Sequence, residues 1–112
     1  MSSLSPEDNK LVVLARATRA RTGAVEGAAL RDLDGRTYAG ATVDLPSLQV
    51  SAIGVVIAMA VSSGAQGAEA TVVLTEGGLS PSDLDALRDF AGEGVLVHRG
   101  DPRGTVSASI TT

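Results

Sequence analysis

The stretch VSAIGVVIAMAVSSG, residues 50–64, decides which fold the sequence favours. It contains no charged residue, so as a helix it would have almost no polar face, and a helix that is apolar on all sides is normally buried. Its apolar run from Val50 to Val61 is well short of the roughly 20 residues that span a bilayer. We therefore expect a buried helix that opens at Pro46-Ser47 and closes at Gly64.

Two further helices are predicted, one on each side of this stretch in the sequence. Each begins with a serine that can cap the helix, a proline suited to the first helical position and an acid in the first turn. Ser5-Pro6 opens the first helix, expected over residues 6–21, and Ser80-Pro81 opens the other, expected over residues 81–90. The segments between the three helices are left for strands.

Five strands are predicted in those segments. Residues 24–31 and 36–43 flank an Asp-Gly pair that favours a tight turn, so these two runs predict a β-hairpin. Residues 70–75, ATVVLT, are suited to a strand buried on both faces, and residues 95–98 and 105–110 are strands joined by the turn-rich RGDPRG. The order predicts an α/β fold in which helices cover a mixed five-stranded sheet, in one domain over residues 1–112.

The composition excludes several classes of function. The chain has no cysteine, so disulfides, thiolate metal sites and cysteine nucleophiles are ruled out. A formal net charge of -4 with scattered basic residues argues against a nucleic-acid partner, and the near absence of aromatic residues leaves few surfaces on which bases could stack. The polar N-terminal stretch MSSLSPEDNK lacks the pattern of a secretory signal. We expect a cytoplasmic protein with no membrane partner.

Three local matches, in this order, resemble the zinc-dependent cytidine deaminase family. GAAL at residues 27–30 followed by DGRTYAG at 34–40 is similar to the family's VGAAL…DGxxYxG hairpin, AVSSG at 60–64 is similar to the AVSEG that ends its zinc helix, and Ser80-Pro81 falls where its PCxxC motif begins. The resemblance covers nearly the whole chain. It implies a three-layer α/β/α sandwich and an oligomer whose neighbouring subunits close the active sites.

The residues that the family uses for chemistry are not matched. The family's C-A-E or H-A-E supplies the first zinc ligand and the proton-shuttling glutamate; its ligand position maps to Ser51 and its glutamate position to Ile53. The two cysteines of PCxxC map to Ser82 and Asp85. A shift of the first alignment by one or two positions changes nothing, because residues 50–56 contain no His, Cys or Glu. These four residues are the expected positions of a degenerate pocket.

The remaining polar residues give weaker indications. Thr42 and Asp44 stand in place of the family's N-x-E nucleoside clamp and are candidate ligand-binding residues, although a turn aspartate bonded to nearby backbone is a simpler explanation of Asp44. His98, the single histidine, is expected to be structural or solvated. A triad of Ser51, His98 and Asp85 can be written down, but no serine lies in a nucleophile elbow. A site built from Asp44 and Asp85 alone would suit Mg²⁺ rather than zinc.

The leading hypothesis is a catalytically inactive cytidine deaminase homologue without a cofactor. It would act as a binding or interaction module for a nucleoside or another protein, and it would form a homo-oligomer, either a dimer or a tetramer. One alternative is an active cytidine or nucleoside deaminase with an unrecognised metal site, for which zinc would be the cofactor. Another is a purely structural oligomer subunit. Because the 50–64 helix would face other subunits, Val56→Asp is expected to disrupt the oligomer.

Overall fold

The computed structural model describes residues 4–112, so residues 1–3 of the polar N-terminal stretch lie outside the described part of the chain. The elements follow one another in an order that matches the predicted one, apart from an additional short hairpin. They are α1 (Pro6–Thr22), β1 (Gly27–Asp32), β2 (Thr37–Ala41), β3 (Val43–Leu45), β4 (Leu48–Val50), α2 (Ala52–Ser62), β5 (Ala68–Leu74), α3 (Pro81–Ala91), β6 (Leu96–Gly100) and β7 (Val106–Thr111).

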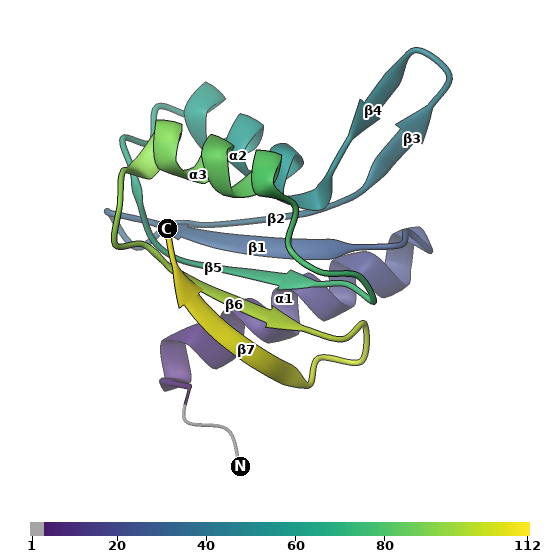
Figure 1. Cartoon of the computed structure of the whole chain (residues 1–112), viewed down its shortest axis with the longest axis horizontal. Coiled ribbons are helices and arrows are strands. Elements are labelled where there is room, and N and C mark those ends of the chain that lie inside the picture. Colours follow the sequence, from purple (N-terminus) through teal and green to yellow (C-terminus); the bar gives the residue numbers. More distant parts are fainter. Residues whose placement is uncertain (1–3) are drawn as a thin grey trace.

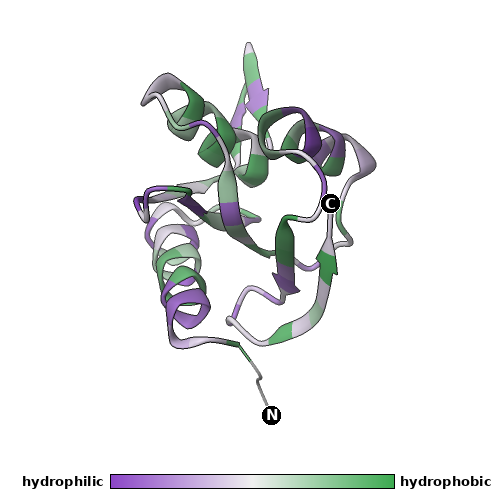
Figure 2. Cartoon of the chain, turned by 90° about the vertical axis from the view of Figure 1, so that its left-hand side faces the viewer, coloured by the Kyte–Doolittle hydropathy of each residue, from purple (hydrophilic) through white to green (hydrophobic). Residues whose placement is uncertain are grey.

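The main sheet has five strands in the order β2-β1-β5-β6-β7. The pair β5–β6 is parallel, because α3 carries the chain back between the two strands, and the other neighbouring pairs are antiparallel. Helix α1 covers one face, while α2 and α3 lie side by side on the other (Figure 1). Figure 2, viewed from the end of the molecule, shows the sheet between these two helical layers. The predicted α/β/α sandwich with a mixed five-stranded sheet is confirmed.

The predicted starts of α1 and α3 and the predicted end of α2 are confirmed by their local contacts. The Ser5 hydroxyl accepts a hydrogen bond from Asp8 N at 3.1 Å and begins α1, and Ser80 caps α3 in the same way. Helix α2 ends at Ser62 with Ser63 as its C-cap, and Gly64 follows with a φ of 90°, a conformation that glycine adopts without a steric penalty. Local sequence signals therefore determine where these helices stop and start.

The β1–β2 turn is built around the buried carboxylate of Asp32. It accepts hydrogen bonds from Asp34 N at 2.9 Å, from Arg36 N at 3.0 Å and from the Tyr38 hydroxyl at 2.8 Å. Burial alone would raise the pKa of Asp32, but the hydrogen bond from Tyr38 and those from the backbone outweigh it, so the pKa lies below its ordinary value. These contacts give Tyr38, the tyrosine of the hairpin motif, a structural role through Asp32, which precedes the motif.

Two glycines of the same hairpin allow the helices to approach the sheet closely. A Cβ atom on Gly27 would lie 2.3 Å from the Ala15 carbonyl oxygen of α1, and one on Gly40 would lie 2.6 Å from Val55 Cγ1 of α2. Each distance is too short for a real contact, so any larger residue would force the helix away from the sheet. The hairpin is thus packed from both faces.

The predicted start of the 50–64 helix was wrong. Pro46-Ser47 is the turn of the β3–β4 hairpin, which projects from the body of the molecule in Figure 1, and α2 begins only at Ala52. The true N-cap is Ser51, whose hydroxyl accepts from Gly54 N at 3.0 Å. Pro and Ser are common both in turns and at helix starts, and here the pairing of Val43 with Val50 selects the turn.

Within the single chain, α2 is buried on one side only. Its inner face, which includes Ile53 and Val56, is fully buried, whereas Met59 and Val61, on either side of the buried Ala60, are 39% and 54% exposed. The reason is geometric: α2 forms part of an outer layer and has only α3 beside it. Within residues 4–112, no helix combines the length and the hydropathy needed to cross a membrane.

Candidate functional site

Helices α2 and α3 meet at their N-termini through one short hydrogen bond. The Ser51 hydroxyl donates to Asp83 Oδ1 at 2.6 Å while it accepts from the backbone of α2 as the N-cap. Asp83 lies in the first turn of α3, and both side chains are half-buried. A carboxylate is favoured at this place because the positive ends of two helix dipoles converge there.

A second carboxylate reaches the start of α2 from another element. Glu26, directly before β1, has its Oε1 atom 3.5 Å from Ala52 N and 3.4 Å from Thr42 Oγ1, both of which donate to it. The backbone also joins these segments, because Thr42 N donates to the Glu26 carbonyl oxygen at 3.2 Å. The beginning of α2 is therefore surrounded by Glu26, Thr42, Ser51 and Asp83, which can accept or donate hydrogen bonds to a polar ligand.

Of the four expected pocket positions, only Ser51 lies in this polar cluster. Ile53 is fully buried in the apolar core between the sheet and the two helices. Ser82 is exposed and hydrogen-bonded to Ser80, and Asp85 is exposed with its carboxylate paired to Arg88 at 3.2 Å. The structure thus brings Ser51 together with Asp83, which lies between the two expected α3 positions in the sequence.

The helix geometry directs Asp85 away from the start of α2. Successive residues of an α-helix are rotated by about 100°, so when Asp83 points toward α2, Asp85 lies about 200° further round the helix. Asp85 therefore faces solvent. The candidate ligand residue Asp44 is also placed differently from the turn explanation, since it is an exposed residue of β3 opposite Gln49.

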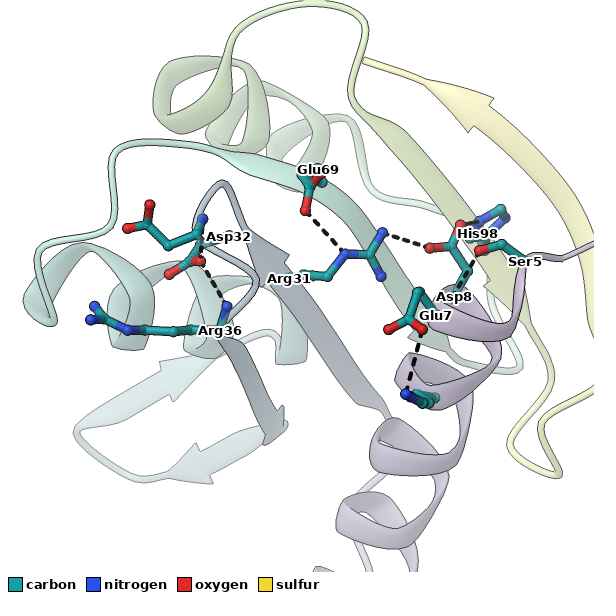
Figure 3. A network of polar contacts seen from close by, with 10 residues as sticks. Ser5, Glu7, Asp8, Arg31, Asp32, Arg36, Glu69 and His98 are labelled. Carbon is teal, nitrogen blue, oxygen red and sulfur yellow. Dashed lines mark hydrogen bonds and ion pairs between the residues drawn. The ribbon is translucent and has the colours of Figure 1, made fainter.

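On the opposite face of the sheet, under α1, a buried network joins residues far apart in the sequence (Figure 3). His98 Nε2 on β6 lies 2.8 Å from Asp8 Oδ2, and the other oxygen of Asp8 accepts from Arg31 at 2.9 Å. Arg31 also pairs with Glu69 at 3.2 Å, and His98 Nδ1 is hydrogen-bonded to Ser109 at 2.7 Å. This network ties the start of α1 to β1, β5, β6 and β7.

The electrostatics of the network favour a charged Asp8. Burial by itself raises the pKa of the Asp8 carboxyl, but the hydrogen bonds from His98 and Arg31 and the charges of these two partners outweigh burial, so the pKa lies below its ordinary value of 3.8. The structural interpretation of His98 therefore agrees with its contacts, and the partners that the sequence did not reveal come from α1 and β7.

The chain of Ser109, His98 and Asp8 is not the triad considered from the sequence. His98 contacts neither Ser51 nor Asp85. The carboxylate that would orient the imidazole is shared with Arg31, which is the arrangement of a structural ion pair. Among residues 4–112, no group of three or more His, Asp and Glu side chains is arranged to hold a metal ion.

Sequence reasoning missed Glu26 and Asp83. A signal for Glu26 was present, because it occupies the position before GAAL where the VGAAL motif has an apolar residue. Asp83 was noticed only as an acid three residues after the Ser80 cap, a position where a side chain often bonds back to the cap. The contact with Ser51 spans 32 residues and required the packing of α2 against α3.

Comparison with known proteins gives a consistent result. The profile of the cytidine deaminase-like family matches residues 4–104. The cytidine deaminase of Burkholderia pseudomallei superposes with a TM-score of 0.76 over 100% of this chain and 92% of that chain, at 22% identity. That of Mycobacterium leprae gives 0.73 over 92% and 93% at 18% identity, and that of Mycobacterium tuberculosis gives 0.72 over 83% and 85% at 23% identity. No curated protein matches by sequence. Because the family profile spans most of the chain and these structures share its fold, the chain belongs to the cytidine deaminase-like family.

Proposed function

We propose that this chain binds a pyrimidine nucleoside without deaminating it, and that it does so as a homo-oligomer. The observation that carries the proposal is the hydrogen bond from Ser51 to Asp83, with the buried Ile53 beside it, at the place where the resemblance puts the zinc ligands and the catalytic glutamate. The family supplies the fold and the location of the site. The side chains at that location supply the argument against turnover.

The side chains at the junction do not fit a deaminase zinc ion. Zinc in these enzymes is held by three histidine or cysteine ligands, and a separate glutamate transfers protons. Ser51 and Asp83 offer one hydroxyl and one carboxylate, which are already bonded to each other. The chain has no cysteine, and its one histidine, His98, is engaged by Asp8 under α1. Ile53 cannot transfer a proton.

The polar groups around the start of α2 suit the hydroxyls and the amide edge of a nucleoside. The Glu26 carboxylate can accept from sugar hydroxyls, and the Thr42 hydroxyl can donate or accept. The hydrogen bonds that these two side chains make to the protein are long, at 3.4 to 3.5 Å, so a ligand hydroxyl can compete with them. Thr42 retains the position of the family's nucleoside clamp. We keep Asp44, on the neighbouring strand β3, as a second candidate ligand-binding residue.

Thermal unfolding with cytidine or uridine tests the proposal. A ligand that binds only the folded state raises Tm by mass action, so millimolar nucleoside should increase the Tm of the wild-type protein. Thr42→Val should reduce that increase, whereas the matched control Thr37→Val, at an exposed position of β2, should leave it unchanged. Chromatography of the cytidine sample should show no uridine. An unchanged Tm at millimolar nucleoside contradicts the proposal and favours a purely structural subunit.

The oligomer is proposed from the exposed apolar side chains around α2. Met59 and Val61 of α2, and Leu45 and Leu48 of the projecting β3–β4 hairpin, are each between 39% and 55% exposed. Helix α2 carries no charge, so two copies can approach without opposing like charges, although the chain as a whole has a net charge of -4. A contact between two copies would remove these side chains from water.

Size-exclusion chromatography with light scattering tests the oligomer. Val56→Asp is unsuitable, because Val56 is fully buried inside the subunit and its replacement would unfold the chain. Met59→Asp should instead give a folded monomer. The control is Val13→Asp, at an apolar position on α1 that is 66% exposed against 39% for Met59, and it should leave the wild-type mass unchanged. A monomeric wild-type protein, or an unaltered mass for Met59→Asp, contradicts this part of the proposal.

A further inference from the structure

A polar cavity lies at the end of the sheet where the parallel strands β5 and β6 terminate, the right-hand end of Figure 1. Its volume is about 490 Å³. Ligands of open α/β sheets commonly bind outside the carboxyl ends of parallel strands, because neighbouring loops diverge there and leave a crevice. The lining comes from the end of α1, the loop after β5, the end of β6 and the β6–β7 turn: Arg19, Thr75, Glu76, Arg99, Asp101, Pro102 and Arg103.

Two arginines of the cavity have donors to spare. Arg19 uses Nε to donate to the Ala24 carbonyl oxygen at 3.0 Å, and within residues 4–112 its two terminal nitrogens make no hydrogen bond. Arg103 is exposed, and its side chain makes no hydrogen bond to any described residue. A planar guanidinium with both terminal nitrogens available is suited to bidentate contact with an oxyanion.

The third arginine shapes the cavity and adds charge. Arg99 donates from Nε to the Gly77 carbonyl oxygen at 2.9 Å and from a terminal nitrogen to Ser107 Oγ at 3.0 Å, so it braces the loop between β5 and α3. These partners are neutral, and the positive charge of Arg99 remains uncompensated by a carboxylate. The cavity therefore concentrates positive charge on an otherwise acidic protein.

The acids of the cavity do not cancel this charge. Asp101 Oδ1 accepts from Arg103 N at 2.9 Å and from Thr105 N at 3.1 Å, so part of its charge is balanced within its own turn. Glu76 is exposed. Thr75, only 5% exposed, accepts from Gly77 N at 3.1 Å, and its hydroxyl proton is left for an anionic acceptor.

This cavity continues toward the polar cluster at the start of α2. A neighbouring cavity of about 360 Å³ shares Arg19, Thr75 and Glu76 with it and is also lined by Val25, Glu26 and Gly77. One end of the combined cleft thus carries free guanidinium groups, and the other end carries the Glu26 carboxylate, which can accept hydroxyl donors. An elongated ligand with an anionic group at one end and hydroxyls at the other matches both ends.

We propose that this cleft binds a small sugar phosphate monoester, with the phosphate held by Arg19 and Arg103 and the sugar hydroxyls directed toward Glu26. A phosphate monoester is close to a dianion at neutral pH and has three acceptor oxygens for the two guanidinium groups. The phosphate site itself does not depend on the proposed nucleoside binding. If the phosphate site and the nucleoside site both bind their ligands, the ligand of the protein is a phosphorylated nucleoside.

Isothermal titration of the full chain with ribose 5-phosphate, inorganic phosphate and ribose tests the proposal. Ribose 5-phosphate should bind saturably and more tightly than inorganic phosphate, and ribose should not bind detectably. The affinity should fall as NaCl is raised, because salt screens the contact. Arg103→Gln should weaken ribose 5-phosphate binding at least about tenfold, since a charged hydrogen bond is lost.

The control variants distinguish the loss of the binding site from unfolding of the chain. Arg88→Gln removes the same charge from the outer surface of α3 and should bind as the wild type does. Arg19→Gln should also weaken binding, and the Tm of this variant shows whether the loss comes from unfolding. If Arg19→Gln unfolds, Arg103→Gln still decides, because the Arg103 side chain makes no hydrogen bond to residues 4–112. No saturable binding of ribose 5-phosphate, or equal affinity for Arg103→Gln and Arg88→Gln, overturns the proposal. A parallel titration with cytidine shows whether nucleoside binding stands without it.

Discussion

On the α1 face of the sheet, Asp8, Arg31 and His98 are brought from three elements into one buried ion-pair network, whereas the α2/α3 face is a largely apolar core whose side-chain hydrogen bonds lie at the helix N-termini and at the β1–β2 turn, where Asp32 accepts from Tyr38. The fold of the family would lead one to expect the costly buried polar groups on the α2/α3 side. Here the buried ion-pair network lies on the opposite side and holds the layers together. The comparison teaches that the conserved shape of a fold does not fix which face carries its ionisable groups.

Removing Asp8 should have the largest effect on this contrast. Asp8→Ala leaves Arg31 and His98 without their carboxylate partner in a buried place, and breaking such a pair costs about 3 kcal/mol of unfolding free energy. Urea unfolding followed by circular dichroism measures it. The matched control is Glu7→Ala on the preceding residue, whose exposed pair with Lys10 contributes little. A loss for Asp8→Ala as small as that for Glu7→Ala would mean that the network does not stabilise the α1 face.

Acid should remove the same contribution gradually. Because the pKa of Asp8 is lower in the folded chain than its ordinary 3.8, the unfolded state takes up protons first, and the stabilisation that is complete above about pH 5 is lost as the pH falls through the folded pKa. Unfolding free energies measured between pH 6 and pH 3, roughly the span of this titration, should fall more steeply for the wild type than for Asp8→Asn. Parallel curves would contradict the assignment, since Asp32, whose pKa is also lowered, titrates in both proteins.

A smaller effect is expected on the other face. Ser51→Ala removes both the cap of α2 and the hydrogen bond to Asp83, and loss of an N-cap costs about 1 kcal/mol. The matched control is Ser82→Ala, an exposed serine of α3 that contacts only the Ser80 hydroxyl. If the two variants lose equal stability, the junction of α2 and α3 is not held by Ser51.

The smallest effect is expected at Asp85. Its carboxylate is exposed and paired only with Arg88 on its own helix, so Asp85→Ala should change the unfolding free energy by less than about 0.5 kcal/mol and leave the nucleoside-induced rise in Tm unchanged. Asp83→Ala, two residues earlier, provides the contrast. A loss of nucleoside binding in Asp85→Ala would restore the original assignment of this residue to the pocket.

The parts of the fold that could be predicted from the sequence were those set by local chemistry. Ser5 and Ser80 cap helices because the hydroxyl bonds a backbone N–H within three residues, and the β1–β2 turn follows from its Asp-Gly pair. Pro46-Ser47 shows the limit of this approach. The same pair fits a helix start and a turn, and only the cross-strand pairing of β3 with β4 distinguishes them.

The candidate site was harder to predict because its contacts are not local. Asp8 and His98 are 90 positions apart, and their pairing depends on α1 lying against β6. Asp83 was not predicted for a different reason. The motif spacing indicated residues 82 and 85, whereas the direction of the Asp83 side chain toward Ser51 depends on how α3 packs against α2.

We propose that a hydrogen bond lies at the junction of α2 and α3 where a deaminase would hold zinc. This is tested by the zinc content per subunit of protein purified without chelator and supplied with zinc, measured together with the ultraviolet assay for cytidine deamination on the same sample. We predict substoichiometric zinc and no turnover. One zinc per subunit with conversion of cytidine to uridine would contradict the claim and make the chain an active deaminase with a metal site that Ser51 and Asp83 do not explain.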